Sequence, residues 1–157
     1  MDVLTQLPAK HRRTVVVKVS PADATKLREL RQNLEAADKD SGGEQSWESM
    51  MALGEMWRAA GLAKLNALKD YMRDLLGASD ESASESSSGK MLVFAHHLAV
   101  LDEAQKVAVN ARVGFIRIDG STSQADRHSA VQRFQNDSKV RLAILSIKAA
   151  GCAKRLF

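Results

Sequence analysis

The sequence has one cysteine, two prolines and an aromatic content of only 4%. A lone thiol, Cys152, excludes an intrachain disulfide and a cysteine-rich metal site, and it fits a reducing compartment. Because aromatic side chains are sparse, the core has to be built from Leu, Val, Ile, Ala and Met. No apolar run approaches the roughly 20 residues of a membrane span. The N-terminal residues also lack the charged start and long apolar stretch of a signal peptide. We therefore expect no membrane partner.

The bulk composition is that of a soluble globular protein, with 45% hydrophobic and 27% charged residues in a chain of 157. This length suffices for one ordinary domain or for one lobe of something larger. The formal net charge of +4 is compatible with a polyanionic partner. Many basic proteins bind no nucleic acid, however, so composition leaves both alternatives open.

Short apolar runs dominate the last third of the chain, at 90–97, 115–122 and 140–151, with helix-patterned sequence at 98–110 and 122–136 between them. This alternation predicts an α/β fold with a parallel sheet in β-α-β-α-β order. Ligands of such open sheets gather outside the carboxyl ends of the strands. The candidate site residues at these ends are His96, His97, Asp119, Gly120, Ser121, Ser146 and Gly151.

The first half of the chain is mostly helix-patterned. A β-branched run at 14–19 predicts a strand. Ser20 followed by Pro21 predicts the start of a helix that ends near Lys39. The pattern of residues 47–76 is helical again.

Gly61 is expected to separate two helices, because a glycine inside a helix costs roughly 1 kcal/mol relative to alanine. A cluster of large apolar side chains in the first of these helices is expected to form core: Trp47, Met50, Met51, Met56 and Trp57. Residues 78–89 are rich in Ser and Glu and predict a flexible linker before the α/β part.

With these residues in view, the chain resembles the second RecA-like lobe of the Swi/Snf-type, superfamily-two helicase-like ATPases. The likeness is closest to the annealing-helicase subgroup that contains the zinc-finger Ran-binding-domain type. The segments that carry it occur in the family's order: residues 4–10 (the crossing between lobes), 60–64 (G-x-A-K), 93–97 (VFAHH, the fourth motif), 116–123 with Arg127 and Phe134 (I-D-G-S-x-S and its helix), and 143–151 (the start of the fifth motif).

The resemblance implies a division into four parts: an inter-lobe crossing at 1–14, a strand with accessory helices at 15–77, the linker at 78–89, and a partial RecA-like lobe at 90–157. It also implies a truncated piece of an ATP-driven DNA translocase or annealing helicase. DNA and the missing first RecA-like lobe would be its partners, ATP and Mg²⁺ would act in the full-length parent, and the parent would be nuclear.

The departures from the family pattern concern ATP. The tail 152–157 departs from the family's fifth motif, and neither the phosphate-cradling G-x-x-x-x-G-K-[ST] loop nor an Asp-Glu-x-His box for Mg²⁺ is present. We therefore expect no ATP hydrolysis by this chain alone, and no catalytic or ATP-binding residue is assigned.

Ser146 is the first candidate for a contact with the DNA backbone. Its hydroxyl and the N–H groups of the following turn could hold a phosphate oxygen. The same residue type serves equally well as a helix N-cap, and only the resemblance favours the DNA contact. The resemblance also implies a backbone contact for His97 and for Gly151, while Lys148 adds local positive charge.

The Asp119-Gly120-Ser121 turn is expected to cap the next helix through Ser121 or Thr122, with Gly120 freeing the backbone and a DNA-phosphate role implied in addition. Arg127 is expected to pair with Asp119 in preference to facing phosphate. No metal site is expected at His96 and His97, because neighbouring side chains on a strand point to opposite faces.

Two other functions stay open at this stage. The chain could be a stand-alone, non-catalytic module that binds nucleic acid or protein. It could also be a fragment that does not fold, because a sheet ending after Ser146 would leave an apolar edge strand exposed.

Overall fold

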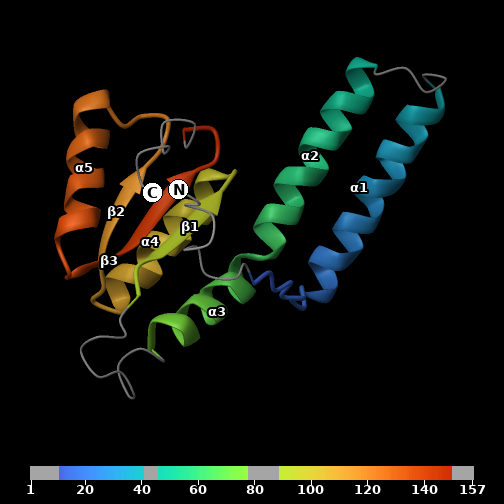
Figure 1. The fold of residues 1–157 in the computed structure, drawn as a ribbon. Helices are drawn as coiled ribbons and strands as arrows, with labels where there is room; N and C mark the ends of the chain where they lie inside the picture. The colour runs from blue at the N-terminus through green and yellow to red at the C-terminus, as the bar shows by residue number, and fades with distance from the viewer. Residues whose placement is uncertain (1–10, 41–45, 78–88, 150–157) are drawn as a thin grey trace, which may run out of the picture.

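The computed structural model describes residues 11–40, 46–77 and 89–149 (Figure 1). Its elements, in chain order, are α1 (Pro21–Asp40), α2 (Trp47–Ala63), α3 (Leu65–Gly77), β1 (Met91–Ala95), α4 (Leu98–Asn110), β2 (Gly114–Ile118), α5 (Gln124–Asn136) and β3 (Val140–Ser146). Residues 1–10 of the predicted crossing, nearly all of the predicted linker and the tail from residue 150 lie outside the described residues.

The sheet is parallel throughout, and its strands lie in the order β1-β3-β2. The predicted β-α-β-α-β arrangement is therefore confirmed. Ala95 of β1 is level with Ser146, and Ile118 of β2 is level with Leu145, so the three strands end at the same edge of the sheet. β3 pairs on both sides, so the edge strands of the described sheet are β1 and β2.

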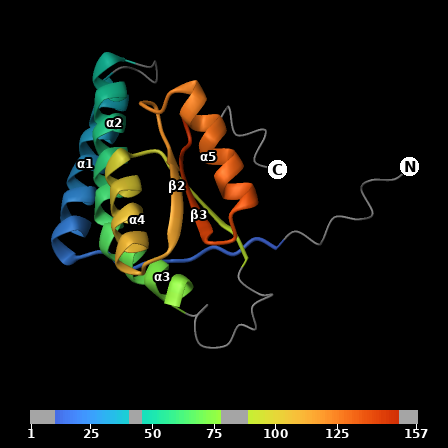
Figure 2. The same ribbon diagram turned by 90° about the vertical axis from the view of Figure 1, so that its left-hand side faces the viewer.

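Helices cover both faces of the sheet. Figure 2 shows α4 on one side of the strands and α5 on the other. On the α3–α4 face, Leu142 and Ile144 pack with Leu101 and Met72. On the α5 face, Ala143 and Leu145 belong to the cluster that includes Phe134 of that helix. Alternate residues of β3 thus enter two separate cores, as the period of two in a strand requires.

A hairpin of α1 and α2 extends away from the sheet, with α3 connecting it to the α/β layers (Figure 1). The helix start at Ser20 and Pro21 is confirmed, since Ser20 Oγ accepts a hydrogen bond of 3.1 Å from the N–H of Asp23. The predicted strand at 14–19 was wrong. That segment has no strand assignment, because among the described residues no neighbouring strand supplies the ladder hydrogen bonds that define one.

Two expectations about α2 were also wrong. The helix continues through Gly61 and ends at Ala63, where Lys64 forms the C-cap. The expected core cluster is largely on the surface: Trp47, Met50, Met51 and Trp57 are between 56% and 70% exposed. Apolar character alone did not reveal that this face of α2 lacks a covering element among the described residues. None of the helices in the described ranges is long and apolar enough to cross a membrane.

Lys90 joins the start of β1 to the end of α5. Its ammonium group donates hydrogen bonds to the carbonyl oxygens of Phe134, Gln135 and Asp137, and it lies 5.0 Å from the centre of the Phe134 ring. A cation at a helix C-terminus satisfies carbonyl groups that have no partner within the helix and interacts favourably with the helix dipole.

Replacing this cation tests its contribution to stability. We expect Lys90→Met to lower the free energy of unfolding by about 1 kcal/mol, because a cluster of helix-terminal carbonyls loses its charged donor. Urea denaturation of the full chain measures the change. Lys106→Met is the matched control, since among the described residues Lys106 makes only an ion pair of 3.3 Å with Glu103, and its own side chain is 69% exposed. Equal effects of the two substitutions would contradict the assigned role of Lys90.

Candidate functional site

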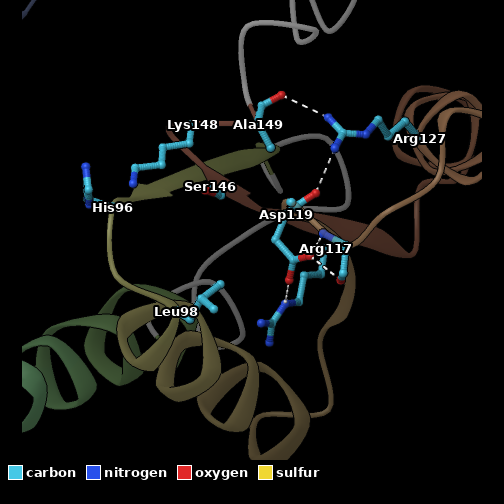
Figure 3. Close-up of a pocket in the computed structure, with 10 residues that line it drawn as sticks. His96, Leu98, Arg117, Asp119, Arg127, Ser146, Lys148 and Ala149 are labelled. Carbon is cyan, nitrogen blue, oxygen red and sulfur yellow. Dashed lines mark hydrogen bonds and ion pairs between the residues drawn. The ribbon is translucent and has the colours of Figure 1, made fainter.

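A pocket of about 710 Å³ lies where the carboxyl ends of the three strands meet (Figure 3). It collects residues from the turns after β1, β2 and β3, which are far apart in the sequence. The lining residues are His96, Leu98, Arg117, Asp119, Gly120, Ser121, Arg127, Ser146, Lys148 and Ala149. Of the predicted site residues, the pocket brings together His96, Asp119, Gly120, Ser121, Ser146 and Lys148, whereas His97 is not in the lining and Gly151 lies outside the described residues.

The turn after β2 is closed by its own side chains. One carboxylate oxygen of Asp119 accepts hydrogen bonds from the hydroxyl of Ser121 at 2.6 Å and from the backbone N–H of Ser121 at 3.0 Å. The N–H of Asp119 donates to Thr122 Oγ1 at 3.0 Å. The donors of Ser121 are thus engaged within the turn, and the following helix is capped by Ser123 instead of Ser121 or Thr122. The expectation about the cap was therefore off by one or two residues.

Gly120 is not required by the backbone of this turn. A Cβ added there would meet no atom within 4 Å, and no left-handed φ is present. The expectation that Gly120 frees the backbone therefore finds no support in the geometry. What the glycine does leave is an open, exposed surface on the turn at the rim of the pocket.

Arg117 holds the Asp119 carboxylate against α4. Its Nε donates to Asp119 Oδ2 at 2.9 Å, while its Nη1 donates to Asp102 Oδ1 at 2.7 Å and to Gln105 Oε1 at 2.9 Å. Burial of Arg117 opposes its charge, but the hydrogen bonds to Asp102 and Asp119 outweigh this, so that its pKa is raised. This guanidinium was missed as a site residue, because its partner Asp102 is fifteen positions away on a helix.

The pKa of Asp119 moves in the opposite direction. The hydrogen bond from the hydroxyl of Ser121 stabilises the ionised carboxylate most, and the hydrogen bond from the N–H of Ser121 adds to that stabilisation. Burial disfavours the ionised form, but Arg117 favours it further. The pKa of Asp119 is therefore lowered. The negative charge in the pocket is thereby kept, but it is neutralised locally by the ion pair with Arg117.

Arg127 fastens two turns together. Its guanidinium donates to the carbonyl oxygens of Asp119 at 2.8 Å and Ala149 at 3.1 Å (Figure 3). It also donates to the carbonyl oxygen of Thr122 at 2.9 Å. The expected pairing with Asp119 therefore occurs through the backbone carbonyl, and the carboxylate pairs with Arg117. Arg127 fixes the turn after β2 to the turn after β3, which sets the shape of the pocket.

Two nitrogen-bearing side chains in the lining remain available to a ligand. Lys148 is exposed, and its ammonium group makes no hydrogen bond or ion pair with any residue in the described ranges. His96 is exposed and makes only ring contacts there. Both lie toward the same side of the pocket in Figure 3. With both arginines engaged by the fold, Lys148 and His96 are the donors that an anion would meet.

Ser146 is the last residue of β3. The residue is buried at 5% exposure, and it still lines the pocket. Its carbonyl accepts from the N–H of Ala149 at 3.0 Å, so the strand ends in a tight turn, and no α-helix is assigned among the residues that follow it up to 149. The alternative role as a helix N-cap stays a prediction, because the residues from 150 on lie outside the described ranges.

His97 faces away from the pocket and toward α2. Its Nε2 donates to the carbonyl oxygen of Trp57 at 3.0 Å. A Cβ added to Gly61 would overlap the Cδ2 atom of this ring and lie 3.1 Å from its Nε2. Residues 57 and 61 are one turn apart on a helix. Gly61 therefore gives the imidazole room to lie against α2, and this contact joins the hairpin to the turn after β1.

Across the part of the chain that the structure describes, no three His, Cys, Asp or Glu side chains come together in a way that could hold a metal ion. The pocket instead presents an exposed ammonium group (Lys148), an imidazole (His96) and a hydroxyl (Ser146) in its lining.

Comparisons with known proteins identify relatives of this chain. Residues 63–153 match the model of the family described as helicase conserved C-terminal domain. The chain is 37% identical to the DNA annealing helicase and endonuclease ZRANB3 of Homo sapiens, over 96% of this chain and 13% of that protein. It is 38% identical to the SWI/SNF-related matrix-associated actin-dependent regulator of chromatin subfamily A-like protein 1 of Xenopus tropicalis, over 95% of this chain and 15% of that protein. The chain thus spans a small part of the length of these relatives.

The lowered pKa of Asp119 predicts a pH dependence of stability. A carboxyl group with a lower pKa in the folded state stabilises the fold above its unfolded pKa, near 4, and this stabilisation is lost as the pH falls through the folded value. We expect Asp119→Asn to lower the free energy of unfolding by roughly 1–3 kcal/mol at pH 7, with the deficit shrinking below pH 4. Urea denaturation from pH 2.5 to 7 measures this.

Asp70→Asn is the control for that series, because Asp70 forms an ion pair of 3.5 Å with Arg73 in which its side chain is 74% exposed. Its substitution is expected to leave stability nearly unchanged. A deficit in Asp119→Asn that stays constant across the pH range would contradict the role assigned to the carboxylate.

The contact between Gly61 and His97 predicts coupled substitutions. We expect Gly61→Ala to destabilise the chain by roughly 1–3 kcal/mol, because the new methyl group overlaps the imidazole ring. In a His97→Ala background the same change becomes neutral or stabilising, since the ring is gone and alanine favours the helix by about 1 kcal/mol. A double-mutant cycle of unfolding free energies measures the coupling.

Gly54→Ala in the same helix is the matched control, since a Cβ there meets nothing within 4 Å. We expect it to be neutral or stabilising in both backgrounds. Additive effects of Gly61→Ala and His97→Ala would show that the two residues do not meet.

Proposed function

Because the chain belongs to the helicase conserved C-terminal domain family, we propose that it supplies one of the DNA-binding surfaces of an ATP-driven DNA translocase of the annealing-helicase type. Its resemblance to the Swi/Snf-type motors is supported by relatives named as a DNA annealing helicase and as a SWI/SNF-related regulator of chromatin. Those names describe proteins several times longer than this chain, so the activity of the whole motor is part of the proposal.

The single observation that carries the DNA-binding role is the pocket at the carboxyl ends of the strands. Lys148 and His96 present donors that are not engaged by other described residues. Ser146, which ends β3 and pairs with Ala95 at the end of β1, also lines the pocket. Lysine ammonium groups and serine hydroxyls are common partners of phosphate oxygens. Such contacts position a protein on DNA without reading its sequence, which suits a motor that must move along any sequence.

Asp119, Gly120 and Ser121 have a supporting part in this proposal. The hydrogen bonds within their turn engage the donors of Ser121, so we assign the turn the role of shaping the rim of the pocket. We retain Gly120 as the place where a phosphate can approach the turn closely, because no side chain covers it. We assign His97 to the junction with α2. Its neighbour His96 is assigned the contact with the ligand instead.

ATP and Mg²⁺ enter the proposal only through the full-length parent. This sequence has no phosphate-cradling loop, so nucleotide binding would need a first RecA-like lobe that closes on this one. The parent would act in the nucleus, in DNA repair or the remodelling of replication forks. This chain alone is not proposed to hydrolyse ATP.

The DNA-binding role is tested with the full chain and a dye-labelled DNA duplex of random sequence. We expect Lys148→Ala to weaken binding roughly fivefold, or about 1 kcal/mol, and to reduce the slope of log affinity against log salt by about 0.9, the value for one lost phosphate contact. Ser146→Ala should weaken binding without changing the salt slope, because no charge is removed. Fluorescence anisotropy between 25 and 200 mM salt measures both.

Lys139→Ala is the matched control. It removes the same charge from the opposite end of β3, next to Val140 and away from the pocket. If Lys139→Ala and Lys148→Ala weaken binding equally, the attraction is a property of net charge and the pocket is not the binding surface. No binding by the native chain would overturn the DNA-binding role itself.

A further inference from the structure

An exposed tryptophan lies next to the proposed phosphate-binding pocket. The Trp57 side chain is 56% exposed, and the centre of its ring is 6.4 Å from that of His96 at an interplanar angle of 66°. His96 in turn lines the pocket. The aromatic surface of α2 and the pocket are therefore joined by one imidazole ring, although Trp57 comes from the helical hairpin and His96 from the turn after β1.

The junction between these two elements keeps Trp57 in place. The hydrogen bond from His97 Nε2 ends on the carbonyl oxygen of Trp57 itself, at 3.0 Å. Gly61 allows the same imidazole to lie against the helix. The rings of His96 and His97 are 5.3 Å apart, so three aromatic rings form a continuous contact from α2 to the end of β1. An aromatic side chain whose backbone is fixed in this way loses little freedom when a ligand binds to it.

An aromatic face beside uncommitted donors has the chemistry that single-stranded nucleic acid requires. Bases of a single strand can stack on aromatic side chains while a basic groove holds the phosphates. Bases inside a duplex are stacked on one another and present no open face. Resting on the DNA-binding function proposed above, we propose that Trp57 is a base-stacking residue that takes an unpaired base of single-stranded DNA whose backbone lies over Lys148 and His96.

The rest of the exposed face of α2 supports this choice of residue. Trp47 is more exposed, at 70%, but it begins the helix, ten residues and so about 15 Å from Trp57. Figure 1 shows the first turn of α2 at the far end of the hairpin from the sheet. Of the two tryptophans in the sequence, only Trp57 lies beside a residue of the pocket.

The experiment uses the full chain with Trp47→Phe, which leaves Trp57 as the only tryptophan. It is titrated with a single strand of thymidylates, with an abasic strand of the same length, and with a duplex of the same length. The thymidylate strand is expected to quench the fluorescence of Trp57, because a stacked base is in direct contact with the indole. The abasic strand carries the same phosphates without bases, so it should bind more weakly and leave the fluorescence unchanged.

Affinity gives the second measurement. Trp57→Ala is expected to weaken binding of the thymidylate strand about tenfold and binding of the duplex less than twofold, while Trp57→Phe retains part of the single-strand affinity. Trp47→Ala should change neither affinity, and thermal denaturation of each variant shows whether it is folded. Gly61→Ala, which moves the ring of His97, should weaken binding of the single strand more than binding of the duplex.

The outcomes separate this inference from the DNA-binding function. If the duplex binds in a way that depends on Lys148 while Trp57→Ala leaves the single-strand affinity unchanged, the stacking role is overturned and the phosphate-binding role stands. An equal loss for single strand and duplex overturns the stacking role too, because it assigns Trp57 to the structure of the surface. Failure of the native chain to bind any of these strands overturns both.

Discussion

The central place of β3 in the sheet determines where every other part of the α/β layers lies. Its residues 142–145 are at most 1% exposed, because strands flank it on both sides and helices cover both faces. A strand buried in this way carries polar side chains only near its ends, so Ser146 is the first polar residue after the buried run 142–145. β1 and β2 end level with it, and the pocket follows from that register.

The two arginines in the pocket lining, Arg117 and Arg127, stabilise the fold, so their charges are not free to bind a ligand. Arg117 joins β2, α4 and the turn after β2, and Arg127 joins the turns after β2 and β3 through carbonyl groups. A planar guanidinium with several donors suits such multiple contacts, whereas a lysine ammonium is a mobile point charge. The engaged arginines therefore hold the pocket in shape, and Lys148 is left to respond to a ligand.

Local sequence patterns predicted the strands of the α/β part and the extents of the helices well, but they failed on the strand at 14–19 and on the burial of α2. The helix at 98–110 agrees with α4, and the three strands occur where apolar runs end in small or polar residues. Local patterns did not predict which segments pair with one another as strands. The run at 14–19 is strand-like in composition, but a strand forms only where a neighbouring strand pairs with it. Trp57 was placed in the core because apolarity does not reveal which neighbour covers a face. The role of Gly61 was missed for a related reason, since its constraint comes from His97, which lies far away in the sequence.

A site with so few uncommitted donors would bind a polyanion weakly, and weak binding suits the proposed function. Two phosphate contacts give a salt slope of about −1.8, so that raising the salt from 50 to 200 mM would weaken binding only about twelvefold, against factors of a thousand or more for proteins with 6–10 contacts. A motor that advances along DNA must release each contact in every cycle, and a surface with many cations would hold too tightly to do so. Stacking on Trp57 would add affinity for unpaired DNA alone, because it needs an open base. The same lobe could then hold duplex loosely and favour the place where duplex and single strand meet, without reading any sequence.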